Sequence, residues 1–554
     1  MPPLDVIFQR AGISLPVPIQ GRHQVDLGAI EAILPPIRGN TIPDLPASVV
    51  AVFKRIADVS AVFSRNGASE KTVMSFEEFV RCDGDSYECS IRGYFQYVSD
   101  THPSYVTALS SIHPIELDEG VRQMHTYITG TSGSGKTELL KALVHHDLTR
   151  GNAAIIIDPQ GNFAQAVARW PEFAGAGADR LVYINPSIAN GMAPALNPLD
   201  GSHLSLDGRE ALAKSLTDVM AQVGGRGDWS SQTENLAENC FKVLVHEPGA
   251  TLRNLRLALL EIDKRGKDIP PTVKAMRDAG LRHHNAEVRD FFEYDFLSGQ
   301  FTASRNSLRS KIGGLLRDDL FTAITCQPSR IRLEELIDAK KVIIFDLGAW
   351  GDGRSAGAFG RMVLAQVSAL GMRRSMQYNT VKVPVHVYVD EADMFVSSSM
   401  LFILSKLRQQ GIHLTLAQQT PAYGYTGQDR DQLLNNTSIK FAAGDGQGAM
   451  LKMMNAPQDA TRHLQQGQFI GRWGRSEAFK LNVRRDLAHR SMSETDWQAA
   501  LKHQVATYYD GPPAPVRMPA LPSPAPTPNR TATKQDLSPI ERHLTRPEQN
   551  EWPE

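Results

Sequence analysis

Short apolar runs alternate with longer amphipathic stretches along much of the chain. The strongest runs lie at 153–157, 342–345 and 385–389, and each has the length and composition of a buried strand. All three are far shorter than the roughly 18 apolar residues that cross a bilayer, so we expect no transmembrane segment. Strands that alternate with helices predict an α/β protein with a mainly parallel sheet that is covered on both faces.

Changes in this pattern predict the domain organisation. Residues 1–111 mix helix-like and strand-like pieces and are expected to form an N-terminal α+β region. Residues 112–201 and 320–490 carry the strand–helix alternation and predict one α/β domain. Between them, 202–319 has charged and apolar residues at helical spacing, which predicts an inserted all-α domain. A connecting helix is expected at 491–510. The proline-rich segment 511–554 predicts a disordered tail, because proline lacks the backbone donor that helices and sheets need.

Composition narrows the class of protein. Lys plus Arg is 59 and Asp plus Glu is 60, so the formal net charge is −1 and a bulk polycation or polyanion is excluded. A local basic surface that binds nucleic acid is not excluded by this balance. Four scattered cysteines are too few for a disulfide framework and indicate a reducing compartment. The N-terminus lacks the pattern of a signal peptide, so the sequence predicts a cytoplasmic protein.

The sequence GTSGSGKT, from Gly130 to Thr137, matches the phosphate-binding loop pattern GxxxxGK[ST]. It follows an apolar strand and precedes an amphipathic helix, which is the context that this motif requires. Glycines let the backbone curl and bring its N–H groups against phosphate oxygens, at a helix N-terminus. Lys136 is expected to reach the β- and γ-phosphates, and Thr137 to ligate Mg²⁺. The predicted ATP-binding residues are Gly130, Thr131, Ser132, Gly133, Ser134, Gly135, Lys136, Thr137 and Glu138.

An acidic pair ends the apolar run at 385–389. Asp390 is expected to hold Mg²⁺, through water, and Glu391 to act as the general base that polarises the attacking water. The second carboxylate indicates hydrolysis, because proteins that only sense a nucleotide often lack it.

Two further strand ends carry polar residues. Asp158 follows the run at 153–157, and we interpret this strand as the neighbour of the P-loop strand. Asp158 either contacts nucleotide or a neighbouring subunit, or belongs to a plain structural turn. A third strand ends in Gln418-Gln419-Thr420, where an amide could sense the γ-phosphate or cap a helix.

Together these segments resemble the TraD/TraG type of coupling protein of type IV secretion and conjugation systems, within the wider HerA/FtsK group of P-loop translocases. The resemblance covers roughly residues 112–485. It rests on the P-loop block that begins at His125 and on several later segments: IIIDPQGN at 155–162, ALNPLD at 195–200, Asp390-Glu391, Arg408 to Ile412, Gln419-Thr420, and Asn436 followed by Lys440. The P-loop alone is shared by many NTPases, whereas the combination is much more specific.

The resemblance implies a RecA-like motor domain, an inserted all-α domain and a homo-hexameric ring. By position it assigns Lys136 and Thr137 to ATP and Mg²⁺, Asp390 and Glu391 to the Walker B pair, and Gln419 to the sensor. Family members usually begin with transmembrane helices, which this sequence does not show. The alternatives are a soluble variant and a protein that a partner recruits to the inner membrane.

The function that follows is ATP hydrolysis coupled to transport of DNA. The resemblance implies that the chain recruits DNA, with single strands preferred, or a relaxase–DNA complex, and moves it toward the channel components of a type IV secretion system. One alternative is a soluble HerA-like DNA pump or a secretion-assembly ATPase. Another is a nucleotide-gated receptor that recruits substrates and turns over little ATP. No base-reading module is present in the sequence, so contacts with the DNA backbone are expected.

Ring ATPases commonly complete each site with an arginine from the next subunit. Arg309 is our candidate for this catalytic role, although spacing alone does not choose among the arginines. Arg305 and Arg309 are four residues apart, so a helix would place them on one face, where they could instead contact DNA phosphates. The other candidates are Arg317, Arg472, Arg475, Arg484 and Arg485.

Overall fold

A computed structural model describes residues 21–23, 74, 76–81, 97, 113–114 and 119–511, except 224–228, 261–268, 351–352, 378–380, 421–426, 475–477, 484–485 and 488. Most of the predicted N-terminal region, and the predicted tail beyond Gly511, therefore lie outside the described residues. Among the described helices, none is both long enough and apolar enough to cross a membrane.

Eleven of the described strands form one large sheet, in the order β2-β1-β12-β11-β10-β3-β9-β8-β4-β7-β5. From β10 to β5 all neighbours are parallel, whereas β11, β12, β1 and β2 extend the sheet in antiparallel fashion. The strands are β1 Gly21–His23, β2 His113–Pro114, β3 Thr126–Gly130, β4 Ala153–Asp158, β5 Leu181–Ile184, β7 Val342–Asp346, β8 Val385–Val389, β9 Ile412–Gln418, β10 Ile439–Ala443, β11 Gln468–Trp473 and β12 Phe479–Val483. A separate antiparallel pair joins β6 Ala193–Pro194 to β13 Tyr509–Asp510.

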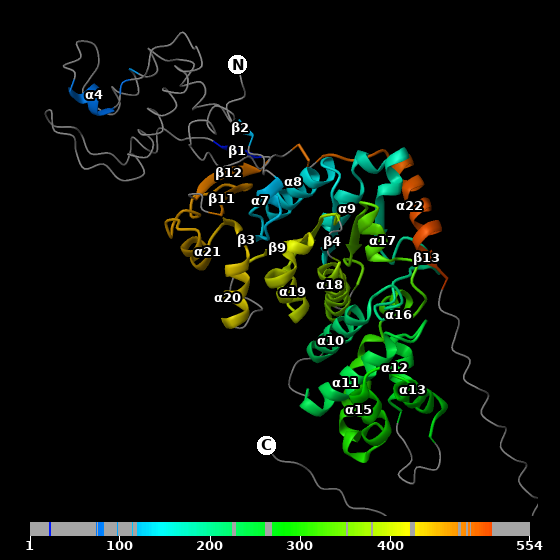
Figure 1. Cartoon of the computed structure of the whole chain (residues 1–554). Coiled ribbons are helices and arrows are strands. Elements are labelled where there is room, and N and C mark those ends of the chain that lie inside the picture. Colours follow the sequence, from blue (N-terminus) through cyan, green and yellow to red (C-terminus); the bar gives the residue numbers. More distant parts are fainter. Residues whose placement is uncertain are drawn as a thin grey trace, which may run out of the picture. The chain divides into compact units, whose positions relative to one another are not determined.

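Helices cover both faces of this sheet (Figure 1). Along β4, Ala153, Ile155 and Ile157 enter one core with α18 (Gly353–Met376), while Ala154 and Ile156 enter a second core with α8 (Lys136–Thr149) and α9 (Asn162–Ala168). Every residue of β3, β4, β7, β8 and β9 is buried. Continuous apolar runs are the signature of strands buried on both faces, so the predicted α/β fold with a mainly parallel sheet is confirmed.

The remaining elements complete the α/β part and its connections. The other helices outside the predicted insertion are α4 Phe76–Arg81, α7 Glu119–Arg122, α17 Leu333–Asp338, α19 Ser398–Phe402, α20 Gly427–Asn436, α21 Gly448–Met453 and α22 Glu494–Tyr508. Short 3-10 or π turns occupy Pro171–Phe173, Gly175–Arg180, Phe291–Asp295, Gly299–Phe301, Ala392–Phe395, Ile403–Leu407 and Arg408–Gln410. The helix α22 lies within the segment where the connecting helix is expected.

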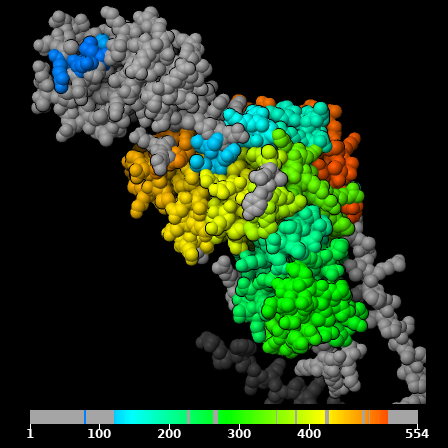
Figure 2. Space-filling view, viewed as in Figure 1, coloured from blue at the N-terminus to red at the C-terminus, as the bar shows by residue number. Residues whose placement is uncertain are grey.

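A run of helices without a sheet strand lies between β6 and α17. It consists of α10 Leu206–Gln222, α11 Ser231–Leu244, α12 Leu252–Ala258, α13 Pro271–Leu281, α14 Ala286–Asp290, α15 Thr302–Leu315 and α16 Asp319–Thr325. We call it the all-α segment. Ser205 and Ser230 cap α10 and α11 by accepting backbone N–H groups, which explains where these helices begin. The helix α10 packs along α18, and Figure 2 shows the green surface of the segment adjoining the α/β part.

The order of the strands corrects one interpretation of the sequence. The strand β4, which ends in Asp158, was expected beside the P-loop strand β3, but β9 and β8 lie between them. Strands that are consecutive in sequence are often neighbours, and this tendency led to the error. Here the crossover after α8 passes over two strands that come much later in the chain.

A buried ion pair ties the P-loop helix to the strands beneath it. Arg122 donates to Asp147 at 2.9 Å, to the Tyr388 hydroxyl at 2.8 Å and to Thr415 at 3.2 Å. The side chains of Arg122 and Asp147 are 2% and 0% exposed. Burial acts to raise the pKa of Asp147, but attraction to Arg122 and His386 outweighs it and lowers that pKa. The pair fixes the end of α8 against β8 and β9.

We expect Asp147→Ala to lower the free energy of unfolding by about 3–5 kcal/mol, because it leaves the Arg122 charge buried and unpaired. Denaturant titration of the purified protein measures this change. The matched control is Asp179→Ala, which breaks the exposed pair with Lys341 (2.5 Å) and should cost less than about 1 kcal/mol. Equal losses in the two variants would contradict the prediction.

Candidate functional site

The predicted P-loop joins the end of β3 to the start of α8. Gly133 and Gly135 have φ values of +76° and +101°. Residues with a Cβ rarely adopt such values, so this turn requires glycine. A Cβ at Gly135 would also lie 3.0 Å from the backbone of Gly467. The loop therefore presents the N-terminus of a fourteen-residue helix, which is a favourable place for an anion.

Lys136 folds back over this loop. Its Nζ donates to the carbonyl of Gly130 at 2.8 Å and to that of Thr131 at 3.4 Å. The side chain is buried, although a lysine is seldom buried without a partner. The amine is thus held over the turn that would surround a phosphate, and the neighbouring Thr137 is partly exposed.

Two glycines that the sequence analysis did not select hold the P-loop in place. The N–H of Gly467, in the loop before β11, donates to the Ser134 carbonyl at 2.9 Å. A Cβ at Gly444, after β10, would lie 2.1 Å from the Thr131 hydroxyl. Both have positive φ. A glycine next to the end of a strand predicts a tight turn from the sequence. The contact between these turns and the P-loop is visible only in the folded chain.

Asp390 and Glu391 lie at the carboxyl end of β8. The N–H of Asp390 donates to the Ile157 carbonyl at 3.1 Å, which fixes this end against β4. Burial, and repulsion from Asp158 and Glu391, raise the pKa of Asp390 to about 7, while attraction to Lys136 opposes the rise. Lys136 and Asp390, which are 254 positions apart in sequence, are therefore close enough for their charges to interact.

Glu391 has a strained backbone. Its φ of 44° and ψ of 54° place a non-glycine residue in the left-handed region. Such conformations cost free energy and concentrate at functional sites. The amide Nε2 of Gln160, in the loop after β4, donates to Glu391 Oε1 at 3.3 Å. The carboxylate thus has a polar partner from a second strand end.

The carboxylate of Asp158 stabilises the turn that follows β4. Its two carboxylate oxygens accept the N–H groups of Gln160 and Ala164, both at 2.9 Å, at the start of α9. This arrangement is the structural turn that the sequence allowed as one alternative. The charge of Asp158 nevertheless acts on Asp390, because β4 and β8 are neighbours.

The two adjacent glutamines differ in position. Gln418 is buried in β9, opposite Thr129 of the P-loop strand, and its Nε2 donates to the Thr420 carbonyl at 2.5 Å. Its Oε1 makes no hydrogen bond among the described residues. Gln419, the predicted sensor, is exposed, and its carbonyl accepts from Gln447 at 3.1 Å. The role of Gln419 stays a prediction.

The candidate arginines are spread over the chain. Arg305 is buried, with its guanidinium 4.6 Å from the centre of the Phe296 ring, whereas Arg309 is partly exposed on the same helix α15. Arg317 is exposed, and Arg472 donates to the Met453 carbonyl at 2.8 Å. The other candidates, Arg475, Arg484 and Arg485, lie outside the described residues. Burial removes Arg305 from the candidates for contact with another subunit.

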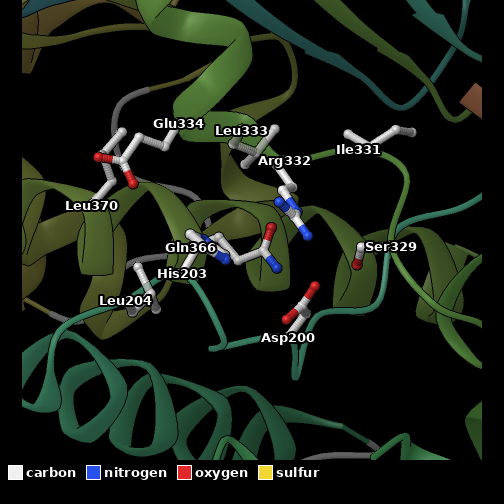
Figure 3. A pocket seen from close by; sticks show the side chains of 10 residues that line it. All are labelled: Asp200, His203, Leu204, Ser329, Ile331, Arg332, Leu333, Glu334, Gln366 and Leu370. Atoms are coloured by element: carbon white, nitrogen blue, oxygen red, sulfur yellow. The ribbon is translucent and has the colours of Figure 1, made fainter. Parts of the chain in front are cut away.

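A small pocket lies where the all-α segment joins the α/β part (Figure 3). Its walls come from the loop before α10, from the chain leading into α17, and from α18. They include Asp200, His203, Ser329, Arg332, Glu334 and Gln366. None of the predicted site residues lines this pocket.

Comparisons with known proteins bear on the family. Residues 109–274 match the family model described as the type IV secretion-system coupling protein DNA-binding domain, TrwB_AAD_bind. This match confirms the resemblance to type IV secretion coupling proteins over that part of the chain. No curated protein matches the sequence.

Solved structures with a distantly similar fold include two types of protein. The plasmid coupling protein TrwB in complex with a non-hydrolysable ATP analogue is 15% identical, with a TM-score of 0.47, over 67% of this chain and 87% of that chain. The VirB4 protein of Thermoanaerobacter pseudethanolicus is 15% identical, with a TM-score of 0.42, over 70% of this chain and 95% of that chain.

The raised pKa of Asp390 predicts a pH-dependent stability. The folded-state pKa of about 7 exceeds the ordinary 3.8, so between these values the folded chain binds more protons than the unfolded chain and loses stability as pH rises. Asp390→Asn removes this charge. We expect the variant to be more stable than the wild type at pH 8, by at most about 4 kcal/mol, and the difference to shrink toward pH 5.

Denaturant titration at the two pH values measures the effect. Asp459 is exposed, so Asp459→Asn is the control and should show no pH-dependent difference from the wild type. A gain of stability in Asp390→Asn that is the same at both pH values would contradict the electrostatic origin.

Proposed function

We propose that the chain is a P-loop ATPase that couples ATP hydrolysis to movement of DNA. The observation that supports this most is that Lys136, which begins α8 after β3, and the Asp390-Glu391 pair, which follows β8, lie at the carboxyl edge of one parallel sheet, where Lys136 acts electrostatically on Asp390. Ligands of open parallel sheets bind at this edge. The donor set fits a nucleotide with its metal: a helix N-terminus, a lysine, a hydroxyl and a buried carboxylate.

In the proposed reaction, Lys136 leaves its backbone carbonyls and binds the β- and γ-phosphates of ATP. Thr137 and Asp390 would hold Mg²⁺, which would neutralise charge on the phosphates when bound. Glu391 accepts a proton from the attacking water as the γ-phosphoryl group passes to that water, and ADP and phosphate are released. Gln160 donates to Glu391 and orients its carboxylate. A buried Asp390 becomes ionised more readily once these positive charges are present.

The proposed cargo is DNA or a relaxase–DNA complex, delivered toward a type IV secretion channel. The family match at 109–274 supports this cargo, because that family is described as a DNA-binding domain of coupling proteins. We propose a homo-hexameric ring in which Arg309 reaches the ATP of the next subunit. A soluble DNA pump and a nucleotide-gated receptor are the alternatives that the experiments below separate.

The first experiment measures ATP hydrolysis without DNA, with single-stranded DNA and with duplex DNA. We expect stimulation by single-stranded DNA. We expect Lys136→Ala to lose both ATP binding and turnover. Glu391→Gln should bind ATP but turn over about 10²–10⁴-fold more slowly, because it lacks the base.

The exposed Glu335 provides the control, and Glu335→Gln should hydrolyse ATP at the wild-type rate. Stimulation by duplex DNA alone would favour the pump. Binding of ATP with negligible turnover under all three conditions would favour the receptor and overturn the motor.

Arg309 is tested by mixing subunits. Arg309→Ala and Lys136→Ala should each be inactive alone. In a mixed ring about a quarter of the interfaces would combine an intact Lys136 with an intact Arg309 from the neighbour, so activity should return to that level. Arg317→Ala, the exposed control on the same part of the chain, should stay active. Failure of the mixture to regain activity would exclude Arg309 as a finger in trans.

A further inference from the structure

Three histidines meet in the all-α segment, away from the P-loop. His246 follows α11, and His283 and His284 follow α13. One potential ligand atom from each lies within 4.8 Å of those of the other two. Among the described residues, these histidines form the one group of three or more potential metal ligands whose ligand atoms lie close together. The P-loop ATPase chemistry does not use it.

The spacing of the rings suits a tetrahedral metal ion. The ring centre of His246 lies 5.1 Å from that of His283 and 5.3 Å from that of His284. The ring centres of His283 and His284 are 4.2 Å apart. In a tetrahedral zinc site, with Zn–N near 2.0–2.1 Å, imidazole centres lie about 5 Å apart. Two of the three distances have this value, and a small movement of His283 or His284 would give the third.

Unpartnered atoms point to the same place. The Nε2 atoms of His246 and His283 are buried and make no hydrogen bond of normal geometry to any described residue, and the same holds for Oε1 of Glu210 on α10. That oxygen lies 3.8 Å from His284 Nε2. His283 itself is only 7% exposed. Buried polar atoms without partners are rare in native proteins, so a cluster of them requires an explanation.

We propose that His246, His283, His284 and Glu210 bind a divalent transition metal ion of the zinc class. Three imidazole nitrogens are borderline ligands that suit Zn²⁺ and Co²⁺ and not the hard ions Mg²⁺ and Ca²⁺, and zinc also accepts a carboxylate oxygen as a further ligand. The three imidazoles supply three positions of a tetrahedral shell. Glu210 Oε1, 3.8 Å from His284 Nε2, would turn toward the ion to supply the fourth, and the filled shell would make the site structural. It joins α10 to the turns after α11 and α13, which are separate in sequence.

The free protein holds the histidines in a competing arrangement. The Nδ1 of His246 accepts from Arg209 at 2.9 Å, and the Nδ1 of His283 accepts from the N–H of Asn285 at 3.2 Å. Ligation through Nε2 moves the ring proton to Nδ1, so both hydrogen bonds must open. Arg209 retains its bonds to the carbonyls of Gly201 and Ser202. The metal therefore competes with Arg209, which gives a way to change the affinity in either direction.

The test uses the full chain without a purification tag, freed of metal by a chelator. Co²⁺ is the probe, because tetrahedral coordination gives it intense visible absorption bands. We expect one Co²⁺ per chain, displaced by Zn²⁺, and a Zn²⁺-dependent rise in the thermal midpoint. His284→Ala removes an exposed ligand, so it should fold normally yet bind Co²⁺ at least tenfold more weakly and lose the rise.

Two further variants separate this site from surface binding. His463 is exposed and distant in sequence, so His463→Ala should bind Co²⁺ as the wild type does. Arg209→Gln removes the competing donor and offers an amide oxygen to Nδ1–H of His246, so it should bind Co²⁺ several-fold more tightly. Co²⁺ binding that is unchanged in His284→Ala, or no saturable Co²⁺ binding by the wild type, would overturn the proposal. Co²⁺ absorption and thermal stability do not depend on ATP turnover. Failure of the metal-site proposal can therefore be distinguished from failure of the proposed ATPase function.

Discussion

The constraint around which the candidate site is built is the burial of one carboxyl group, that of Asp390, among charges of its own sign. Asp158 and Glu391 disfavour its ionisation, and Lys136 opposes them across β9. Such an arrangement persists only if the surrounding backbone cannot relax. Strands β3, β9, β8 and β4 supply that rigidity, since they are buried on both faces and hydrogen-bonded to each other. Ionisation of Asp390 is therefore unfavourable in this sheet, and a bound cation would favour it.

The loops at this edge are fixed by contacts too close for side chains. A Cβ at Gly161 would lie 2.5 Å from the Asp346 carboxylate, and one at Gly348 would lie 2.5 Å from the Gln160 carbonyl. Asp346 is held in turn by Tyr183 at 2.5 Å and by Asn185 at 2.7 Å. The turn that carries Gln160 is thus clamped between β4 and β7, so the partner of Glu391 has a defined position.

The helices of the all-α segment are positioned by local caps and by packing on one face of the sheet. The segment's helices begin at these caps, and their apolar side chains form one continuous core with one face of the sheet, where α10 packs on α18. Its polar cluster of three histidines and Glu210 has no role in the P-loop chemistry. A metal ion bound there would link segments that helix propensity alone leaves independent.

The sequence by itself determined the local features: the P-loop, the buried strands, the acidic pair after 385–389 and the helical character of the insertion. These features depend on backbone rules and periodicity within a few residues. Only the tertiary structure decided that β9 and β8 separate β4 from β3, that Gln418 and not Gln419 is buried, and that Arg305 is buried while Arg309 is accessible. It also brought together histidines from separate turns. Burial and charge environment are set by segments far apart in the chain, and a single sequence carries no local signal for which of them will meet.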